Sequence, residues 1–121
     1  MRKFFEEARK QPWFDNTIFV LEGDHGKLVG DAECELPESY NHIPLMIYSS
    51  RIQPEEKTAF GGQVDIQPTI LGLLNIDYLQ NNFGVDLLKE ERPCMFYTAD
   101  NMIVGRNDTL LYLYNLSLIH I

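Results

Sequence analysis

Residues 17–26, which read TIFVLEGDHG, constrain the fold of this chain more than any other stretch. An unbroken run of β-branched and aromatic residues fills positions 18–21, as in a strand buried on both faces of a parallel sheet. The run stops at Gly23, and Asp24 and His25 follow at the carboxyl end of the strand. Open α/β sheets bind their ligands at that edge. We therefore predict a central strand that carries two polar side chains to a functional edge.

Asp24 and His25 are flanked by Gly23 and Gly26. Neighbouring side chains on a regular strand point to opposite faces, so these two can reach one point only where the backbone leaves the extended conformation. The flanking glycines allow such a departure. One carboxylate oxygen and one imidazole nitrogen make half of a divalent-metal site, suited to zinc or manganese. The alternative interpretation is an aspartate that caps a turn beside a partly exposed histidine.

The segments on either side extend an α/β pattern. Residues 2–11 combine an apolar stripe with charged residues on the opposite face, which predicts a helix that stops at Pro12. Residues 43–48 predict a second buried strand. Asp65 is a suitable N-cap for a helix that ends near Asn75, and we interpret it as a helix entrance and not as a catalytic residue.

Two or three short strands are predicted after Pro93, at residues 95–98, 102–104 and 109–114, as an antiparallel meander at the edge of the sheet. Residues 116–121 continue apolar with no stop signal, and we interpret them as a truncated or foreign tail. The predicted fold class is thus α/β, a partial doubly wound sheet with a C-terminal antiparallel edge meander.

The charge balance narrows the range of partners. The net charge of −8 argues against nucleic acid and against an anionic membrane surface, because both select basic proteins. No stretch approaches the roughly 18 consecutive apolar residues that a membrane span requires. Cys34 and Cys94 have no metal-binding spacing, and we expect plain thiols in place of a disulfide.

Four blocks of the sequence resemble one family. In chain order they are WFDNTIFVLEGDHG, HIPLMIYSS, GGQVDIQPTILGLLNI and FGVDLL, and the resemblance that they carry covers roughly residues 1–112. They resemble the carboxyl-terminal part of the sulfatase-like branch of the alkaline phosphatase superfamily, above all its lipoteichoic acid synthase and phosphoglycerol transferase members. The resemblance implies that residues 1–115 are the C-terminal part of a catalytic domain and that residues 116–121 lie outside it.

In the family that this chain resembles, the matching aspartate and histidine bind the catalytic divalent metal, which implies that role for Asp24 and His25. The metal would be manganese or zinc, or calcium or magnesium in a sulfatase. His42 directly precedes the second strand and so lies at its entrance, not at its carboxyl edge. The resemblance implies a substrate-contacting histidine there, and the alternative is a polar loop histidine. Residues 27–41 would form the rim of the site.

Nothing in the chain matches the family's nucleophile, which is a threonine in the transferases and a modified cysteine or serine in the sulfatases. The resemblance assigns that residue to the amino-terminal half of the domain, so we expect no catalytic nucleophile here. A catalytic metal also needs about three protein ligands, and Asp24 and His25 supply two. We therefore expect the chain to be a carboxyl-terminal fragment of an enzyme that lacks turnover by itself.

The resemblance implies a parent enzyme anchored in the cell membrane, with its catalytic domain outside the cytoplasm. Such an enzyme would move a phosphoglycerol-type group from a phospholipid to a glycan or polymer, and no nucleic acid or partner chain is implied. A sulfuric ester hydrolase of the same superfamily is the main rival. A second alternative is a non-catalytic α/β binding module with a structural Asp-His pair. The module would be a stable monomer, whereas the fragment would expose apolar sheet edges.

Overall fold

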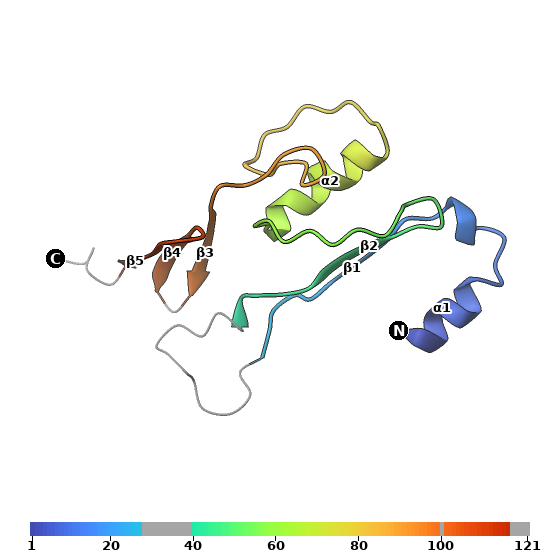
Figure 1. Cartoon of the computed structure of the whole chain (residues 1–121), viewed down its shortest axis with the longest axis horizontal. Coiled ribbons are helices and arrows are strands. Elements are labelled where there is room, and N and C mark those ends of the chain that lie inside the picture. Colours follow the sequence, from blue (N-terminus) through green and yellow to red (C-terminus); the bar gives the residue numbers. More distant parts are fainter. Residues whose placement is uncertain (28–39, 100, 117–121) are drawn as a thin grey trace. The chain divides into compact units, whose positions relative to one another are not determined.

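The computed structural model describes residues 1–27, 40–99 and 101–116. Most of the predicted rim, Cys34 and nearly all of the predicted tail therefore lie outside the described residues. The elements, drawn in Figure 1, are α1 (Arg2–Ala8), η1 (Phe14–Asn16), β1 (Phe19–Glu22), β2 (Leu45–Tyr48), η3 (Gln63–Asp65), α2 (Ile66–Leu73), β3 (Met95–Ala99), β4 (Met102–Arg106) and β5 (Leu111–Asn115).

The chain divides into two units, Met1–Glu56 and Lys57–Ile121, and each is described by itself. In the first unit β1 and β2 pair antiparallel, with Phe19 opposite Tyr48 at one end of the register. This corrects the prediction of a parallel neighbour for the central strand. The strand also alternates between half-buried and exposed side chains, and Val20 is 38% exposed. An apolar run predicts burial, but it carries no information on the direction of the neighbouring strand.

An aromatic cluster forms the core of this unit, and Phe19 is its centre. The Phe19 ring centroid lies 5.3 Å from that of Phe5 in α1, 5.5 Å from that of Phe14 and 6.3 Å from that of Trp13. Trp13 and Phe14 thus pack the end of the helix against the strands. Aromatic pairs in such tilted or edge-on arrangements contribute about 0.5–1.5 kcal/mol each beyond the area they bury.

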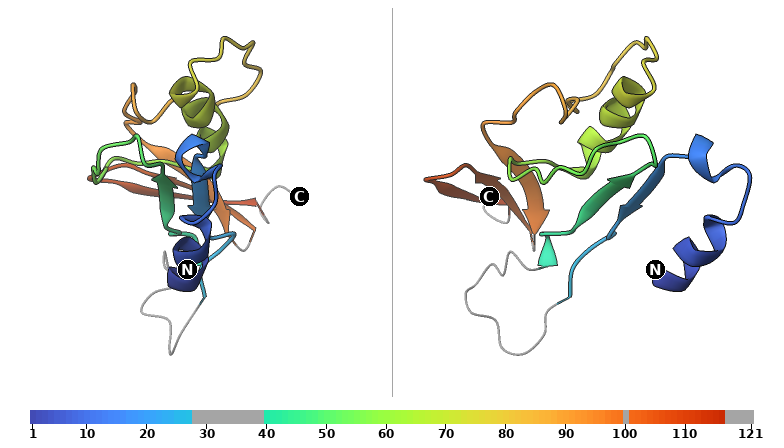
Figure 2. Two further views of the ribbon diagram at one scale, coloured as in Figure 1. Left: turned by 90° about the vertical axis from the view of Figure 1, so that its right-hand side faces the viewer. Right: turned by 45° about the vertical axis from the view of Figure 1, so that its right-hand side comes forward.

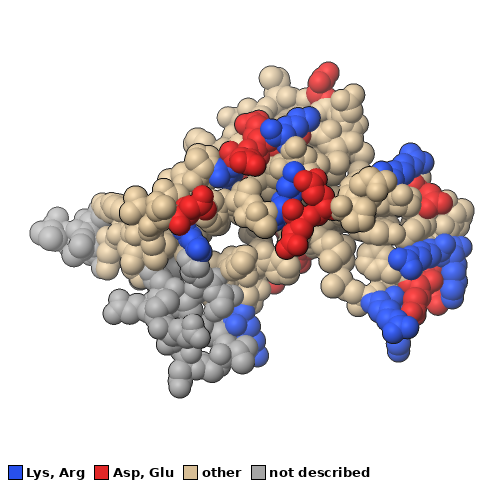
Figure 3. All heavy atoms as spheres, in the orientation of Figure 1, with Lys and Arg blue, Asp and Glu red and all other residues tan. Residues whose placement is uncertain are grey.

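Helix α1 presents its charged side chains to solvent, as predicted. Positively and negatively charged side chains lie together over this element in Figure 3. Two ion pairs within one turn join them, Arg2 with Glu6 at 2.9 Å and Lys10 with Glu7 at 2.6 Å. The helix ends at Ala8, earlier than predicted, because the chain tightens into three-residue turns before Pro12.

In the second unit, α2 ends in a well-formed cap. Asn75 takes a left-handed backbone with φ of 52°, its N–H donates to the Gly72 carbonyl, and the Ile76 N–H donates to the Leu71 carbonyl. This pair of bonds is a Schellman motif, which satisfies carbonyls that the helix itself leaves unpaired. Asparagine is one of the few residues that accepts this conformation at low cost, so the predicted end of the helix is explained.

The predicted meander is present, as Figure 2 shows. Strands β3, β4 and β5 pair antiparallel in chain order, and among the described residues they form a three-stranded sheet of their own. The central strand holds Val104, which is fully buried, whereas every side chain of β5 is exposed. The Asn107 side chain closes the second turn by accepting the Leu110 N–H at 2.7 Å. Cys94, just before β3, is a free thiol as expected.

Candidate functional site

Antiparallel pairing brings the end of β1 and the beginning of β2 to the same place. Beyond the strands, the Gly23 N–H donates to the Pro44 carbonyl at 3.3 Å, and the Gly26 N–H donates to the Tyr40 carbonyl at 2.7 Å. The segment that carries Asp24 therefore runs beside the segment that leads into β2. Both segments belong to the first unit.

His42 lies between the two residues that accept these backbone bonds. Its side chain is exposed. The sequence placed it at the entrance of its strand, away from a carboxyl edge, and in a parallel sheet that position would be at the opposite end from Asp24 and His25. The pairing direction reverses this expectation, because in an antiparallel pair the entrance of one strand meets the exit of the other.

Asp24 and His25 form a close and solvent-exposed dyad. The Asp24 Oδ1 accepts the His25 backbone N–H at 3.0 Å, and the Asp24 Oδ2 lies 3.6 Å from the His25 Nε2. The Asp24 side chain is 90% exposed and that of His25 is 60% exposed. The predicted convergence of these two neighbouring side chains is therefore present in the structure.

The prediction that the conformational freedom of the flanking glycines allows this convergence is wrong for Gly23. Its backbone does not adopt a left-handed conformation, and a Cβ added there would lie 3.4 Å from the Cβ of Ile43, an ordinary contact distance. The convergence follows instead from the end of the ladder after Glu22, where the chain leaves the strand and Asp24 folds back onto the His25 amide.

A hydrogen bond of the His25 ring indicates which of its nitrogens carries a proton. Its Nδ1 lies 2.7 Å from the Gly26 carbonyl oxygen. A carbonyl oxygen only accepts, so this bond places the proton on Nδ1. The lone pair of the neutral ring is then on Nε2, the nitrogen that lies nearest to Asp24 Oδ2.

The spacing of these two donor atoms fits one divalent ion. Nitrogen and oxygen ligands lie about 2.0–2.2 Å from zinc, so two of them can be no more than about 4.4 Å apart. The 3.6 Å between Nε2 and Oδ2 satisfies that limit. Within the described part of the chain, no group of three or more His, Cys, Asp or Glu residues is arranged to hold a metal. The dyad thus presents two donor atoms at a suitable spacing, and their binding of a metal stays a prediction.

Tyr40, which belongs to the predicted rim, is a neighbour of the dyad. Its ring stacks on that of His25, with centroids 5.5 Å apart and an angle of 20° between the planes. Tyr40 is 45% exposed, so it is not the core residue that an aromatic side chain beside a strand usually is. No signal in the sequence points to this contact, because Tyr40 and His25 meet only through the antiparallel pairing.

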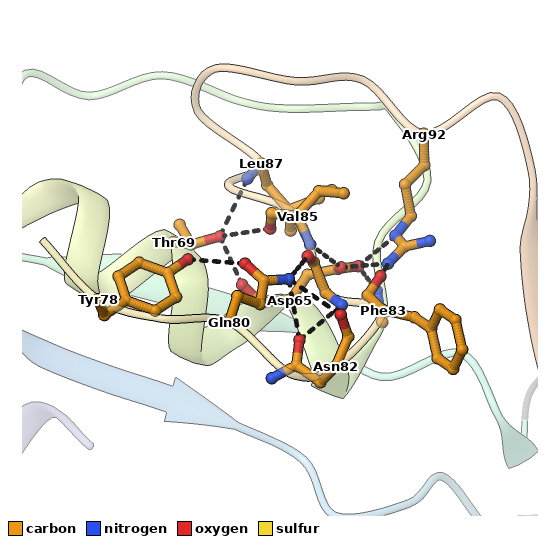
Figure 4. Close-up of polar contacts among 11 residues, drawn as sticks. Asp65, Thr69, Tyr78, Gln80, Asn82, Phe83, Val85, Leu87 and Arg92 are labelled. Atoms are coloured by element: carbon orange, nitrogen blue, oxygen red, sulfur yellow. Dashed lines mark hydrogen bonds and ion pairs between the residues drawn. The ribbon is translucent and has the colours of Figure 1, made fainter.

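A second dyad, Asp65 with Arg92, lies in the other unit and is drawn in Figure 4. Asp65 is fully buried and accepts from the Arg92 Nε at 2.7 Å and from the Arg92 Nη2 at 2.5 Å. The same carboxylate accepts the Gly62 N–H and the Val85 N–H, both at 2.8 Å. Asp65 is the N-cap residue of α2, as predicted, but its side chain makes no capping bond to that helix. As the last residue of η3, Asp65 reaches back to Gly62 and across to a later segment.

Thr69 extends this buried network by one turn of α2. Its hydroxyl donates to the Asp65 carbonyl at 2.6 Å and accepts the Leu87 N–H at 3.0 Å. Arg92 also donates to the Phe83 carbonyl. Three side chains therefore tie the segment that includes Phe83 and Leu87 to the helix.

The electrostatics of Asp65 agree with a structural role. Burial raises the pKa of its carboxyl, but the hydrogen bonds from Arg92, Val85 and Gly62 outweigh burial and bring the pKa below its ordinary value of 3.8. The bond to Asp65 raises the pKa of the Arg92 guanidinium. Both charged groups are committed to each other and to backbone partners, so we assign this dyad to the fold and not to a ligand. This agrees with the interpretation of Asp65 as non-catalytic.

The architecture matches a known superfamily. A solved structure of a protein in the alkaline phosphatase superfamily from Vibrio parahaemolyticus is similar to this chain, with a TM-score of 0.81 and 27% sequence identity. The similarity covers 93% of this chain and 28% of that one. A model of the family described as Sulfatase matches residues 1–76, well over half of the chain, which include both dyad residues and His42. The chain belongs to the sulfatase family.

Two curated relatives show the breadth of the family. Lipoteichoic acid synthase 2 of Bacillus subtilis (strain 168) is 30% identical over 75% of this chain and 16% of its own length. Arylsulfatase K of Gallus gallus is 34% identical over 74% of this chain and 17% of its own length. The chain thus spans about a sixth of the length of these relatives. The resemblance stated on the four sequence blocks is confirmed.

Proposed function

We propose that this chain supplies part of the metal site of a phospho-group transferase that acts on extracytoplasmic lipid-linked or glycan substrates. The observation that carries the proposal is the 3.6 Å spacing of the Asp24 Oδ2 and the His25 Nε2, in a dyad open to solvent. The tautomer of His25 supports it, because the bond to the Gly26 carbonyl leaves the lone pair on the nitrogen that faces Asp24.

Each residue has a stated role in this proposal. Asp24 and His25 would hold a divalent cation, manganese or zinc in a transferase, or calcium or magnesium in a sulfatase. When bound, such an ion lowers the pKa of a nucleophilic hydroxyl and stabilises negative charge on the oxygens of the transferred group. His42, on the neighbouring segment, would donate a hydrogen bond to the substrate.

The nucleophile and the remaining acidic ligand would come from a part of the catalytic domain outside these 121 residues. The short coverage of the relatives supports this, and so do the exposed apolar side chains of β5, among them Tyr112 at 61%. We infer that the chain has no turnover by itself. The parent enzyme would be anchored in the cell membrane, although neither helix in the described residues is long and apolar enough to cross one.

Hydrolysis of sulfuric esters is the second candidate function. The 34% identity to arylsulfatase K favours this function. The dyad does not distinguish the two functions, since a metal held there would serve either reaction. The two functions differ in the nucleophile, a threonine for phosphoryl transfer and a modified cysteine or serine for sulfatase chemistry. They also differ in the ester that is cleaved.

The proposal is tested by sequencing the DNA upstream of the Met1 codon on an intact template. A reading frame that continues through a strand-end acidic residue and a threonine supports the transferase, and a cysteine or serine in that place supports the sulfatase. A stop codon and a ribosome-binding site directly before Met1 would contradict both and favour the non-catalytic module.

The protein encoded by the whole frame is then assayed with bis(p-nitrophenyl) phosphate and with p-nitrophenyl sulfate. We expect release of nitrophenol from the phosphodiester alone, with loss of activity in a chelator and recovery with manganese or zinc. Cleavage of the sulfate ester alone would replace the first candidate with the second. Activity that resists chelation would overturn the metal role of the dyad.

A further inference from the structure

We propose that Tyr40 is a positioning residue that holds the His25 imidazole in its metal-accepting orientation, an inference that rests on the metal role proposed above for the dyad. Tyr40 acts on His25 directly through its ring and indirectly through its carbonyl, which bonds to the Gly26 N–H. Neither of these two Tyr40 groups would bind the metal itself.

The first contact is the ring stack. The Tyr40 and His25 ring centroids are 5.5 Å apart and their planes differ by 20°, so one face of the imidazole is covered. An imidazole that is 60% exposed would otherwise exchange among side-chain rotamers. The stack restricts the ring to the plane in which its Nε2 faces Asp24.

The second contact acts through the backbone. The Tyr40 carbonyl accepts the Gly26 N–H at 2.7 Å, and the Gly26 carbonyl in turn lies 2.7 Å from the His25 Nδ1. Tyr40 therefore anchors the residue whose carbonyl sets the tautomer of the ring. A chain of two short bonds links the entrance of β2 to the protonation pattern of His25.

The geometry also indicates which part of Tyr40 orients the His25 ring. The stack uses the face of the ring, which phenylalanine presents equally well, and the backbone bond is independent of the side chain. Tyr40→Phe should therefore preserve the orientation of His25, whereas Tyr40→Ala removes the stack. Tyr40→Leu keeps apolar bulk without a planar ring, and it replaces the alanine variant if that variant does not fold.

The test is NMR of the ¹⁵N-labelled chain at about pH 8, where imidazoles are neutral. Long-range ¹H–¹⁵N correlations report the tautomer of each histidine, and His25→Gln assigns the His25 signals. We expect the Nδ1–H tautomer of His25 in the wild type and in Tyr40→Phe, and a mixture of tautomers in Tyr40→Ala. His42 should not change.

Titration with Mn²⁺, followed by electron paramagnetic resonance, supplies the second readout. Loss of the stack should weaken binding about 3- to 10-fold in Tyr40→Ala, and Tyr40→Phe should stay within about twofold of the wild type. An unchanged tautomer and unchanged affinity in Tyr40→Ala would overturn the positioning role. A tautomer shift in a chain that does not bind Mn²⁺ would uphold the positioning role and contradict the proposed function.

Discussion

Two pairs in the described part of the chain, Asp24 with His25 and Asp65 with Arg92, each join an aspartate to a nitrogen base, yet they differ fully in burial. The Asp24 side chain, which pairs with His25, is 90% exposed, whereas Asp65, which pairs with Arg92, is fully buried. The buried carboxylate is surrounded by two backbone amides and two guanidinium nitrogens. The exposed carboxylate accepts the amide of the residue next to it, lies 3.6 Å from the ring nitrogen of that residue, and belongs to a side chain that is 90% exposed.

The difference shows how burial assigns roles to charged groups. A buried charge must be paired and hydrogen-bonded, since an unpaired one costs several kcal/mol. Once it is satisfied in this way it cannot bind a ligand without losing those partners. An exposed carboxylate is stabilised by water, which a cation can displace. The comparison therefore separates Asp65, which stabilises the fold, from Asp24, which is accessible to a ligand.

The largest expected effect is on stability at the buried dyad. Asp65→Ala should destabilise the chain by about 3–5 kcal/mol, because it leaves the Arg92 guanidinium and the Val85 amide without their partner. Urea unfolding followed by circular dichroism measures the loss, and hydrogen exchange at the Val85 amide localises it.

The matched control is Lys89→Gln in the same unit. It removes an ion pair between a lysine side chain that is 67% exposed and the Asp86 side chain, which is 11% exposed and keeps its bond from the Leu88 N–H, so the loss should be smaller than in Asp65→Ala. Equal losses in the two variants would show that burial does not distinguish the dyads.

The next effect is a dependence of stability on acid. The folded-state pKa of Asp65 lies below its ordinary value of 3.8, so its contribution is complete above about pH 5 and is lost as the pH falls through 3.8 toward the folded-state pKa. The slope from this one group is at most about 1.4 kcal/mol per pH unit.

Urea midpoints of the wild type and of Asp65→Asn, compared from pH 6 to pH 3, isolate this term because the other carboxyls titrate in both proteins. We expect the difference between the two proteins to shrink as the pH falls. A constant difference would mean that the charge of Asp65 does not support the fold.

The smallest effect on stability is expected at the exposed dyad, where the effect on metal binding should be large. Asp24→Asn should leave the unfolding midpoint unchanged, since water replaces the interactions of a side chain that is 90% exposed. The same variant should weaken Mn²⁺ binding by about 10-fold or more, because it removes a negatively charged ligand.

Asp77→Asn serves as the control for nonspecific attraction of the cation, since Asp77 is an exposed aspartate of the other unit. Binding that falls equally in both variants would indicate diffuse charge attraction and not a site. A loss of stability in Asp24→Asn would give the Asp-His pair the structural role of the non-catalytic module.

Much of the local structure could be predicted from the sequence. The strands, the helix that begins after Asp65, the meander and the proximity of Asp24 to His25 all follow from short-range patterns. The spacing of apolar residues, the turn residues and the prolines each act over a few positions, so a single sequence is enough to recognise these patterns. The four blocks that resemble the family lie within these same segments.

The long-range contacts were decided by the tertiary structure alone. The direction of the β1–β2 pairing brought Tyr40 onto His25 and the segment that carries His42 beside the segment that carries Asp24, and a strand's side-chain pattern does not encode whether its neighbour runs parallel or antiparallel. Asp65 meets Arg92 across 27 positions, a distance at which no periodic signal survives. Local residue chemistry thus determined which groups are present, and strand direction and burial determined which of them meet and which remain open to solvent.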